Sequence, residues 1–564
     1  MKTLSIKICL VSMVLGFAVS KADATECTPP AGYNACFKVD ITDDKSDNNL
    51  GDGKCKSGPD DASCTLRAAI EQANQLAPAQ ISLIQLPKGN YPISNGQLNI
   101  KLNAQISLKG EGANNTKILG SGRILQVGPD ANFDIDGVNL YGGQVINNNG
   151  GGIYNVKGAI LTLKNCKFES NEVAGKVDKD NNNIVTLFGS RGGAIYNDQG
   201  TVDIENCEFS SNSAYKANLA NNANWSPDEK QQAADLVVAS GRGGAIYSNE
   251  GILNIRRSIF YGNFAESGAV VFGFASTTLI ENSTITNNSS NTGGMIDSSH
   301  NFNRFDLSNI TINEGSNIAL RNDDGGGLYI KNSILVGICN GTVTSQGYNL
   351  VYVQTGTCDF TQDATNLVGD NQGGIDPIFG DFQKVNSSWV YPLDAGSPAI
   401  DAANPAGCTD KSDNPLLTDQ TGFARPTGAQ GRCDIGAVEM GCGNNIKEVG
   451  ELCEDGNLID GDNCDSTCKP TGCGSGAITG DEECDDGNLV DGDGCDHLCK
   501  LEESATGGGS ATGGSATGGQ SGDGGGGCGI EQSSQASAWV ICLFALFIFS
   551  VFALVKFNHK KLKR

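Results

Sequence analysis

The sequence predicts an all-β protein whose body is a right-handed parallel β-helix, with an N-terminal helical cap, small disulfide-rich modules and a C-terminal transmembrane helix. Three observations favour this solenoid. A Gly-Gly motif recurs, a second motif follows it at a similar distance, and alternating apolar residues precede the second motif. The cleanest unit runs from Gly268 to Gly293, about 25 residues. A coil of that length buries its inward side chains only by stacking on its neighbours.

The two ends of the chain predict export and anchoring. Residues 1–24 begin with Lys2 and Lys7, continue with a short apolar stretch and end in small residues. This order is typical of a cleavable signal peptide. Residues 536–555 form an apolar run long enough to span a membrane. The basic tail, 556–564, should stay cytoplasmic. We therefore expect an exported cell-surface protein with a single-pass anchor.

The composition narrows the classes of partner. A net charge of −25 argues against nucleic acid and anionic lipid, since both are bound chiefly through Lys and Arg. Of 21 cysteines, Cys9 lies in the signal peptide and Cys542 in the apolar run. With Cys528 also set aside, 18 remain, which allows nine disulfides in an oxidising compartment.

A cap is expected before the first coil. Residues 64–74 have helical spacing and lie in a disulfide-containing segment, 25–80. The first coil of a stack would otherwise present unpaired strand edges to water and to other chains. We therefore expect the helix to cover this open end, with the parallel β-helix occupying residues 81–440.

The recurring motifs give the body its register. The Gly-Gly motif is clearest at 150–154, 192–196 and 243–247, and the second motif at 165–168, 206–209, 257–260, 282–285 and 332–335. An Asn stands three residues after the first four copies of the second motif: Asn171, Asn212, Asn263 and Asn288. Asn tolerates left-handed backbone, and its amide can bond to the same residue one coil away. We expect these four residues to form a ladder at a turn.

Cys166 and Cys207 occupy the same inward slot of successive copies. They either form a disulfide or stack as small apolar residues. Neighbouring paired strands rarely offer relaxed disulfide geometry, so we favour stacking.

Two cysteine-rich modules follow, at 441–470 and 471–500, with a 31-residue offset. Their disulfide candidates are Cys442, Cys453, Cys464, Cys468, Cys473, Cys484, Cys495 and Cys499. Their acidic loops either bind Ca²⁺ through oxygen atoms or are ordinary turns. The Ca²⁺ candidates are Asp455, Asn457, Asp460, Asp462, Asp486, Asn488, Asp491 and Asp493. No other cofactor is expected.

A Gly/Ser/Thr-rich linker, 501–535, should hold the body away from the bilayer. It contains Cys528, which is either a processing site or a spare thiol.

Several segments resemble known families. Residues 64–74 resemble the segment that opens many bacterial surface β-helices, and the two recurring motifs resemble chlamydial polymorphic outer-membrane protein repeats; both resemblances imply a pectin-lyase-like fold. Residues 392–401, 419–426 and 433–439 are similar to the end of "choice-of-anchor" surface domains. The cysteine-rich modules resemble myxobacterial-type repeats. The chain end resembles GlyGly-CTERM sorting tails, which implies a sorting protease that acts in the membrane.

Catalytic residues are not predicted. His300 is the one histidine of the body and lies in a polar turn. A carboxylate site at Asp297, Asp306, Asp323 and Asp324, close to Arg321, is a weaker hypothesis than solvated turns. Arg191 and Arg242 precede equivalent Gly-Gly pairs and should stack at one corner.

The sequence thus predicts an adhesin-like or structural binding scaffold for an extracellular protein or polysaccharide ligand. The polar inserts near 176–190 and 214–240 and the acidic cysteine-rich modules are the expected contact surfaces. The alternative is an extracellular polysaccharide lyase or glycoside hydrolase built on the same fold.

Overall fold

The computed structural model describes residues 27–502 with internal gaps, all within the first of two compact units, Met1–Glu502. The gaps are 59–62, 220–221, 299, 353–355, 371–373, 427–431, 446, 448–450, 458, 460–463, 465–467, 470–473, 475–477, 479–481, 486, 488–489 and 492–493. The expected signal peptide, transmembrane helix, basic tail, Cys528 and nearly all of the linker lie outside the described residues. No helix in the described part is long and apolar enough to cross a membrane.

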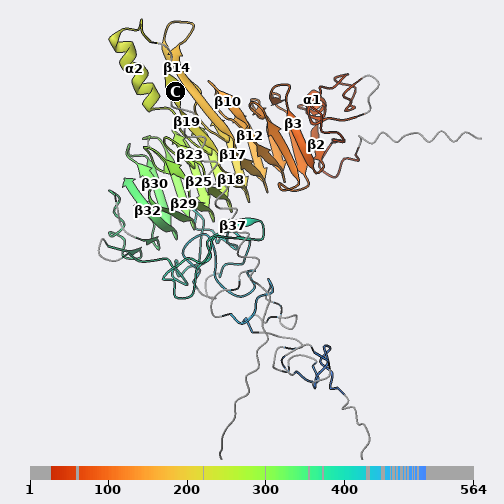
Figure 1. Cartoon of the computed structure of the whole chain (residues 1–564), viewed down its shortest axis with the longest axis vertical. Helices are drawn as coiled ribbons and strands as arrows, with labels where there is room; N and C mark the ends of the chain where they lie inside the picture. Colours follow the sequence, from red (N-terminus) through yellow and green to blue (C-terminus); the bar gives the residue numbers. More distant parts are fainter. Residues whose placement is uncertain are drawn as a thin grey trace, which may run out of the picture. The chain divides into compact units, whose positions relative to one another are not determined.

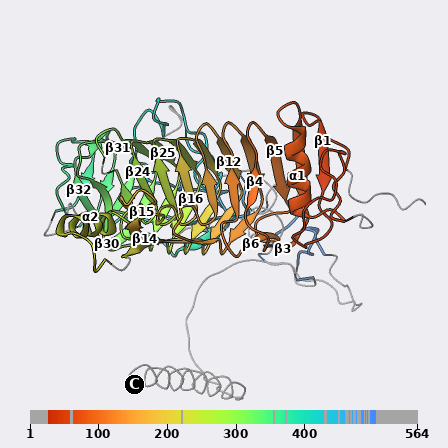
Figure 2. The ribbon, with the colours of Figure 1, turned by 90° about the horizontal axis from the view of Figure 1, so that it is seen from above.

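The described body is a stack of parallel strands, as Figures 1 and 2 show. Sheet I has eleven strands in the described residues. They are β1 (Ala35–Lys38), β2 (Ile81–Leu86), β5 (Gln105–Gly110), β8 (Asn132–Asp136), β12 (Ile160–Lys164), β17 (Thr201–Glu205), β21 (Ile252–Arg256), β25 (Thr277–Glu281), β29 (Arg304–Ser308), β31 (Gly327–Lys331) and β33 (Thr344–Ser345).

Sheet II consists of two parallel ladders. The first ladder comprises β4 (Leu98–Ile100), β7 (Leu125–Val127), β11 (Ile153–Asn155), β16 (Ile195–Asp198), β20 (Ile246–Asn249), β24 (Val271–Phe274) and β28 (Ile296–Asp297). The second ladder comprises β3 (Gly89–Ile93), β6 (Thr116–Gly120), β9 (Asn139–Tyr141), β13 (Lys167–Glu169), β18 (Glu208–Ser210), β22 (Ile259–Tyr261) and β26 (Thr284–Thr286). The long strand β30 (Thr311–Asn322) pairs with both ladders and joins them, and β32 (Ile334–Gly341), β34 (Leu350–Val351) and β35 (Leu367–Val368) follow it.

Sheet III lies between the second ladder and the next copy of the first. Its strands are β10 (Gln144–Ile146), β14 (Glu172–Lys179), β19 (Ser213–Leu219), β23 (Phe264–Ala265) and β27 (Ser289–Ser290), with β15 (Val185–Phe188) paired to β14. Each full coil therefore passes through the first ladder, sheet I, the second ladder and sheet III in turn. The parallel pairing runs from β1 to β35. It therefore begins before residue 81 and ends before residue 440, the two limits expected for the β-helix.

Single residues turn the chain at the corners of each coil. The corner between sheet I and the second ladder has left-handed backbone, with φ of 51° at both Asn165 and Asn206. The ladder residue Asn171 is not itself left-handed; the preceding Ser170 is, with φ of 57°. The expected left-handed position was therefore wrong by one residue, because the amide of Asn171 must point inward to reach the next coil.

The predicted Asn ladder is confirmed. The amide Nδ2 of Asn171 donates to Oδ1 of Asn212 at 2.9 Å, and Asn212 donates to Asn263 and Asn263 to Asn288 at 3.0 Å each. The ladder ends on the buried Glu314, whose Oε1 accepts from Nδ2 of Asn288 at 2.7 Å. Every donor of this buried row therefore has an acceptor in the next coil.

The inward face beside the ladder is apolar and closely stacked. The rings of Phe168, Phe209 and Phe260 lie parallel at centroid distances of 4.8 and 4.7 Å. Cys166 and Cys207 are buried free thiols, which confirms the stacking interpretation. These two cysteines therefore do not form one of the nine disulfides that the cysteine count allows.

Helix α1 (Leu66–Leu76) covers the N-terminal end of the stack, as predicted. Thr65 caps the helix, and its side chain accepts from the amide of Ala68. Arg67 bonds through Nε to Asp44 at 2.6 Å and through its terminal nitrogens to the carbonyls of Gly96 and Gln97. The buried ion pair lies within the cap, and the bonds from Arg67 to the two carbonyls fix the cap to the first coil. Strand β1, which pairs with β2, was not predicted, because its sequence does not recur in the repeat.

The two polar inserts form one lobe (Figure 1). The hairpin β14–β15 comes from the first insert, and helix α2 (Pro227–Val238) comes from the second. Val177, Val185, Ala217 and Ala233 form its small core. Neither insert has enough apolar surface to bury alone, so the two pack on each other.

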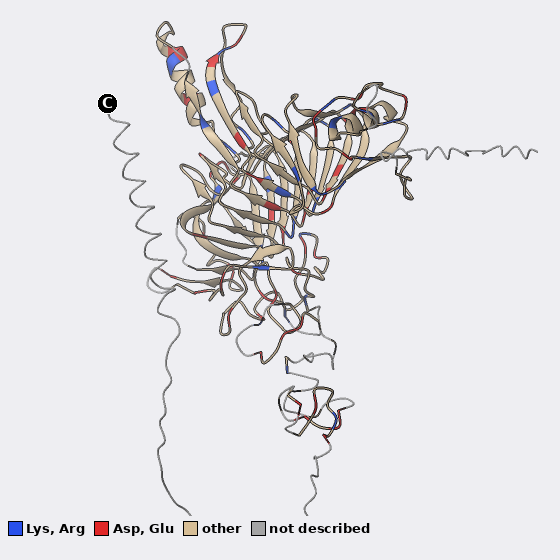
Figure 3. Ribbon diagram, turned by 45° about the vertical axis from the view of Figure 1, so that its right-hand side comes forward, with Lys and Arg blue, Asp and Glu red and all other residues tan. Residues whose placement is uncertain are grey.

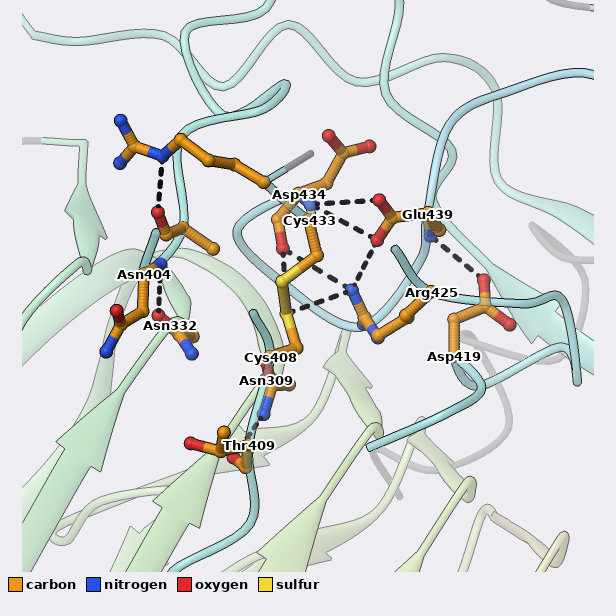
Figure 4. The surroundings of a disulfide bond; sticks show 12 residues. Asn309, Asn332, Asn404, Cys408, Thr409, Asp419, Arg425, Cys433, Asp434 and Glu439 are labelled. Atoms are coloured by element: carbon orange, nitrogen blue, oxygen red, sulfur yellow. Dashed lines mark hydrogen bonds and ion pairs between the residues drawn. A yellow bond between two sulfur atoms is a disulfide. The ribbon is translucent and has the colours of Figure 1, made fainter. Parts of the chain in front are cut away.

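After β35 the chain folds back along the second ladder with few strands. β36 (Gln383–Val385) and β37 (Ser388–Val390) form a hairpin. A buried network holds the remainder: Arg425 donates to Glu439 Oε2 at 2.7 Å and to the carbonyl of Gly436 at 2.8 Å, beside the disulfide Cys408–Cys433 (Figure 4). The motifs at 419–426 and 433–439 are therefore bonded to each other through Arg425.

The other described disulfides join cysteines that are close in sequence, 9 to 26 residues apart. The described pairs are Cys27–Cys36, Cys55–Cys64, Cys339–Cys358, Cys442–Cys468, Cys453–Cys464 and Cys484–Cys495. The first module thus joins its first cysteine to its fourth and its second to its third. Cys499 is also disulfide-bonded, and Cys473 lies outside the described residues.

Candidate functional site

The outward face of the second ladder is only partly covered. The chain between β35 and the first cysteine-rich module, which we call the returning segment, covers the later strands of this ladder. There Gln420 accepts from Thr284 Oγ1 at 2.6 Å, and the amide of Ala437 donates to Thr311 Oγ1 at 3.0 Å. The outward side chains of the earlier strands are covered to different degrees: those of β18 are buried, those of β13 are half-buried, and Tyr141 of β9 is exposed. A groove of about 280 Å³ lies at the boundary. Lys167, Glu208 and Ile259 line it on one side and the tip of hairpin β36–β37 on the other.

Alternation along the strands brings a charged cluster to this face. Lys167 and Glu169 flank the inward Phe168, and register places Glu208 beside Lys167 one coil on. The Lys167 ammonium lies 3.0 Å from Glu208 Oε1, which also accepts from the Tyr261 hydroxyl at 2.7 Å. We call Lys167, Glu169, Glu208 and Tyr261 the groove cluster. Figure 3 shows that basic and acidic residues share the same strands of the body.

Residues of the preceding coils extend the cluster. Asn139 Nδ2 donates to Glu169 Oε2 at 3.0 Å, and the Lys117 ammonium lies 3.5 Å from the same atom and 4.2 Å from the centre of the Tyr141 ring. The Asn139 side chain is buried, and its Oδ1 has no hydrogen-bond partner among the described residues. A buried acceptor without a donor is costly, so a buried water is expected to supply one.

The environment fixes the protonation state of the cluster. Burial alone would raise the pKa of Glu169, but the Asn139 hydrogen bond and the charges of Lys117 and Lys167 outweigh it and hold that pKa below its usual value. Burial, followed by the bond to Glu208, raises the pKa of Tyr261 to about 12. Near neutral pH Glu169 is therefore ionised and Tyr261 protonated; both lie beside Lys167 and Glu208, the two members of the cluster that line the groove itself.

An aromatic wall stands beside the groove cluster. The Phe382 ring lies 5.3 Å from Trp389, 4.9 Å from Tyr391 and 6.2 Å from Tyr261, measured between centroids. These rings are half-buried. Asn206 Nδ2 donates to Ser387 Oγ at 3.0 Å and ties the hairpin tip to the coil. The arrangement places a packed aromatic cluster next to fixed polar groups, a combination typical of small-ligand sites.

The predicted Ca²⁺ candidates fall mainly outside the described residues. Asp455 Oδ2 accepts from the amide of Cys464 at 3.1 Å, Asn457 Oδ1 from the amide of Ile459 at 2.7 Å, and Asp491 Oδ1 from the amide of His497 at 2.9 Å. Such bonds are typical of turns. Asp460, Asp462, Asp486, Asn488 and Asp493 are not described. The Ca²⁺ site stays a prediction.

Of the residues of the weaker carboxylate hypothesis, the structure brings Asp297 and Asp323 together around Arg321 and places Asp306 elsewhere. Asp297 lies on the first ladder next to Arg321, at 3.8 Å, and Arg321 Nε bonds to Asp323 at 2.5 Å. Asp306 lies on sheet I and pairs with Arg304 through two bonds of 2.8 Å. His300 packs on Phe274 at a centroid distance of 4.1 Å. These residues are divided between two faces.

The groove cluster was not predicted from the sequence, although the outward residues of the second motif give a signal for it. The outward residue inside the second motif is Lys167 and then Glu208 in the first two copies, and Ile259, Thr284 and Ile334 in the later ones. This change from charged to small or apolar side chains marks where the returning segment begins to cover the ladder.

Comparisons with known proteins are limited. A domain family described as "Domain of unknown function (DUF4215)" matches residues 465–500, which include the second cysteine-rich module. No curated protein matches the chain. The chain is 12% identical to pectate lyase Pel9A over 72% of its own length and 97% of that structure, with a TM-score of 0.30. It is 13% identical to ORF18 of Geobacillus virus E2 over 57% and 58%, with a TM-score of 0.24. The fold assignment therefore rests on the strand pairings.

Proposed function

We propose that this chain is an adhesin-like surface scaffold that binds an extracellular glycan in the groove of the second ladder. The observation that carries the proposal is the partly exposed groove cluster beside an aromatic wall. Sugar rings offer apolar faces and many hydroxyls, so stacked rings and fixed polar groups suit them together.

The disulfides support an extracellular location, since such bonds persist in oxidising compartments. In this proposal the predicted C-terminal helix anchors the chain, either permanently or until a sorting protease acts near Cys528. The flexible linker would then hold the groove away from the bilayer.

A polysaccharide-cleaving enzyme is the second candidate, because Glu169 and Glu208 belong to the same cluster. Hydrolysis of a glycosidic bond needs one carboxyl group that stays protonated near neutral pH. The pKa of Glu169 is instead lowered. A lyase needs a base, and Tyr261, with its pKa raised to about 12, stays protonated. The electrostatics therefore favour binding over cleavage.

The test is a glycan array probed with the full mature chain, followed by titration of any glycan that binds. Lys167→Gln removes the cation next to Glu208 and should weaken binding about tenfold, because a hydrogen bond to a charged group contributes roughly 1.5–3 kcal/mol. Lys157→Gln is the matched control, since Lys157 is exposed in a turn of the same coil. It should bind like the wild type.

Two results would count against the proposal. One is an array on which the wild type binds no glycan. The other is a glycan whose affinity falls equally in the Lys167 and Lys157 variants, because its site would then lie elsewhere.

A further inference from the structure

An arginine pair lies at the base of the lobe, on a different face from the groove. Arg191 follows the first insert directly and Arg242 follows the second. The two residues pair as a parallel β-bridge, which confirms that they stack at one corner. The bases of the inserts are joined there, since the amide of Gly241 donates to Ser190 Oγ at 2.9 Å.

Both guanidinium groups lie on an aromatic row of the first ladder. Tyr196, Tyr247 and Phe272 stack at successive coils, with centroid distances of 5.5 and 5.3 Å. The Arg191 guanidinium carbon lies 5.2 Å from the Tyr247 centroid, and that of Arg242 lies 4.6 Å from the Phe272 centroid. Stacking on rings fixes the planes of the two cations and keeps their side chains extended.

The charges of the pair are not balanced by bonds. Among the described arginines, Arg191 and Arg242 are the two whose guanidinium groups have neither an ion pair nor a hydrogen bond. The Nε of Arg191 is buried without a hydrogen-bond partner in this part of the chain. Burial lowers the pKa of Arg242, although Tyr247 and the nearby Asp297 carboxylate act in the opposite direction.

Arg304 provides a comparison within the same protein. Its guanidinium carbon lies 4.8 Å from the Tyr329 centroid, so it stacks on a ring of the next coil as Arg242 does. Arg304 also forms two bonds of 2.8 Å to Asp306. Arg123 and Arg432 also lie over rings and bond to carbonyl oxygens. Covering a ring therefore does not require an unpaired guanidinium, and among the described arginines the lack of any bond is specific to Arg191 and Arg242.

We propose that Arg191 and Arg242 bind a tetrahedral oxyanion, the sulfate or phosphate group of an extracellular ligand. Residues at the same position of neighbouring strands lie about 4.8 Å apart, so two guanidinium groups can each offer N–H donors to one such group. A carboxylate is planar and is satisfied by a single guanidinium, so it should bind less tightly. This site is independent of the glycan groove.

The test is calorimetric titration of the full mature chain with sodium sulfate, sodium phosphate and sodium acetate. Wild type should bind sulfate or phosphate saturably and acetate at least tenfold more weakly. Arg191→Gln and Arg242→Gln should each weaken binding at least tenfold, and Arg304→Gln should leave it unchanged. Comparing sulfate with phosphate identifies the preferred group.

A second measurement uses the unaltered protein, in case a variant fails to fold. Phenylglyoxal modifies accessible arginines, and mass spectrometry locates the modified peptides. Sulfate or phosphate should protect Arg191 and Arg242 but not Arg257, which pairs with Glu205 elsewhere on the surface. The proposal is overturned if the wild type binds no anion saturably, if acetate binds as tightly, or if protection and affinity do not depend on the pair.

Discussion

Glu314 makes the Asn ladder sensitive to pH, and Glu314→Gln should remove that sensitivity. Burial raises the pKa of Glu314 from 4.5 to about 7, although Asn288 donates to it. A raised carboxyl pKa means that the folded state holds its proton more tightly than the unfolded state does. The contribution to stability is therefore complete below about pH 4.5 and is lost as the pH rises to 7.

The size of the effect follows from the shift. A change from 4.5 to about 7 corresponds to about 3 kcal/mol at 1.36 kcal/mol per pH unit. Gln keeps the acceptor for Asn288 and carries no charge. At pH 8, Glu314→Gln should therefore raise the free energy of unfolding by up to about 3 kcal/mol, and at pH 4 it should change it little.

The assay is guanidinium-induced unfolding of wild type and variant at both pH values, followed by circular dichroism. Glu250→Gln is the control, because Glu250 lies in an exposed turn. Other buried carboxyls, such as Glu439, also titrate, so the difference between variant and wild type is the quantity to compare. An equal stabilisation at pH 4 and pH 8 would refute the reasoning.

Three further predictions concern packing. Iodoacetamide should leave Cys166 and Cys207 unmodified in the native protein and should alkylate both after unfolding without reductant, as read by peptide mass spectrometry, since both are buried free thiols. Arg425→Met should cost about 3–5 kcal/mol and expose the returning segment to protease, because three buried carboxyls lose their cation. Asn212→Ala should lower the free energy of unfolding by about 1–3 kcal/mol, since two ladder neighbours lose a bond.

The parts of the fold that repeat were predictable from the sequence. The ladder at Asn171, Asn212, Asn263 and Asn288 and the stacked thiols follow from one rule, because equivalent residues of successive coils meet. The capping helix was predictable for a related reason, since the first coil leaves strand edges that must be covered.

The parts that do not repeat could not be predicted in this way. Strand β1 is four residues long and has no copy elsewhere in the chain. The returning segment lacks periodicity, so its motifs indicate an end of the domain but not that the chain folds back over the second ladder. The lobe depends on two inserts packing together across coils, which neither insert signals alone.

The groove is formed by repeating strands, which could be predicted, and by the non-repeating returning segment, which could not. Period-two alternation predicts that Lys167, Glu169 and Glu208 face outward. Their isolation as a cluster arises only because the returning segment covers the strands that follow and brings the aromatic wall beside Tyr261. A site formed jointly by the coils and a non-repeating segment therefore cannot be predicted from the repeat alone.

The most direct test of binding without cleavage is the length of a bound glycan after prolonged contact with the protein. The glycan identified on the array is incubated with the full mature chain and recovered for size-exclusion chromatography. The account predicts that it is retained by the wild type, released by Lys167→Gln and recovered at its original length. Shortened products that are absent with Glu208→Gln would contradict the account and identify the groove as an active site.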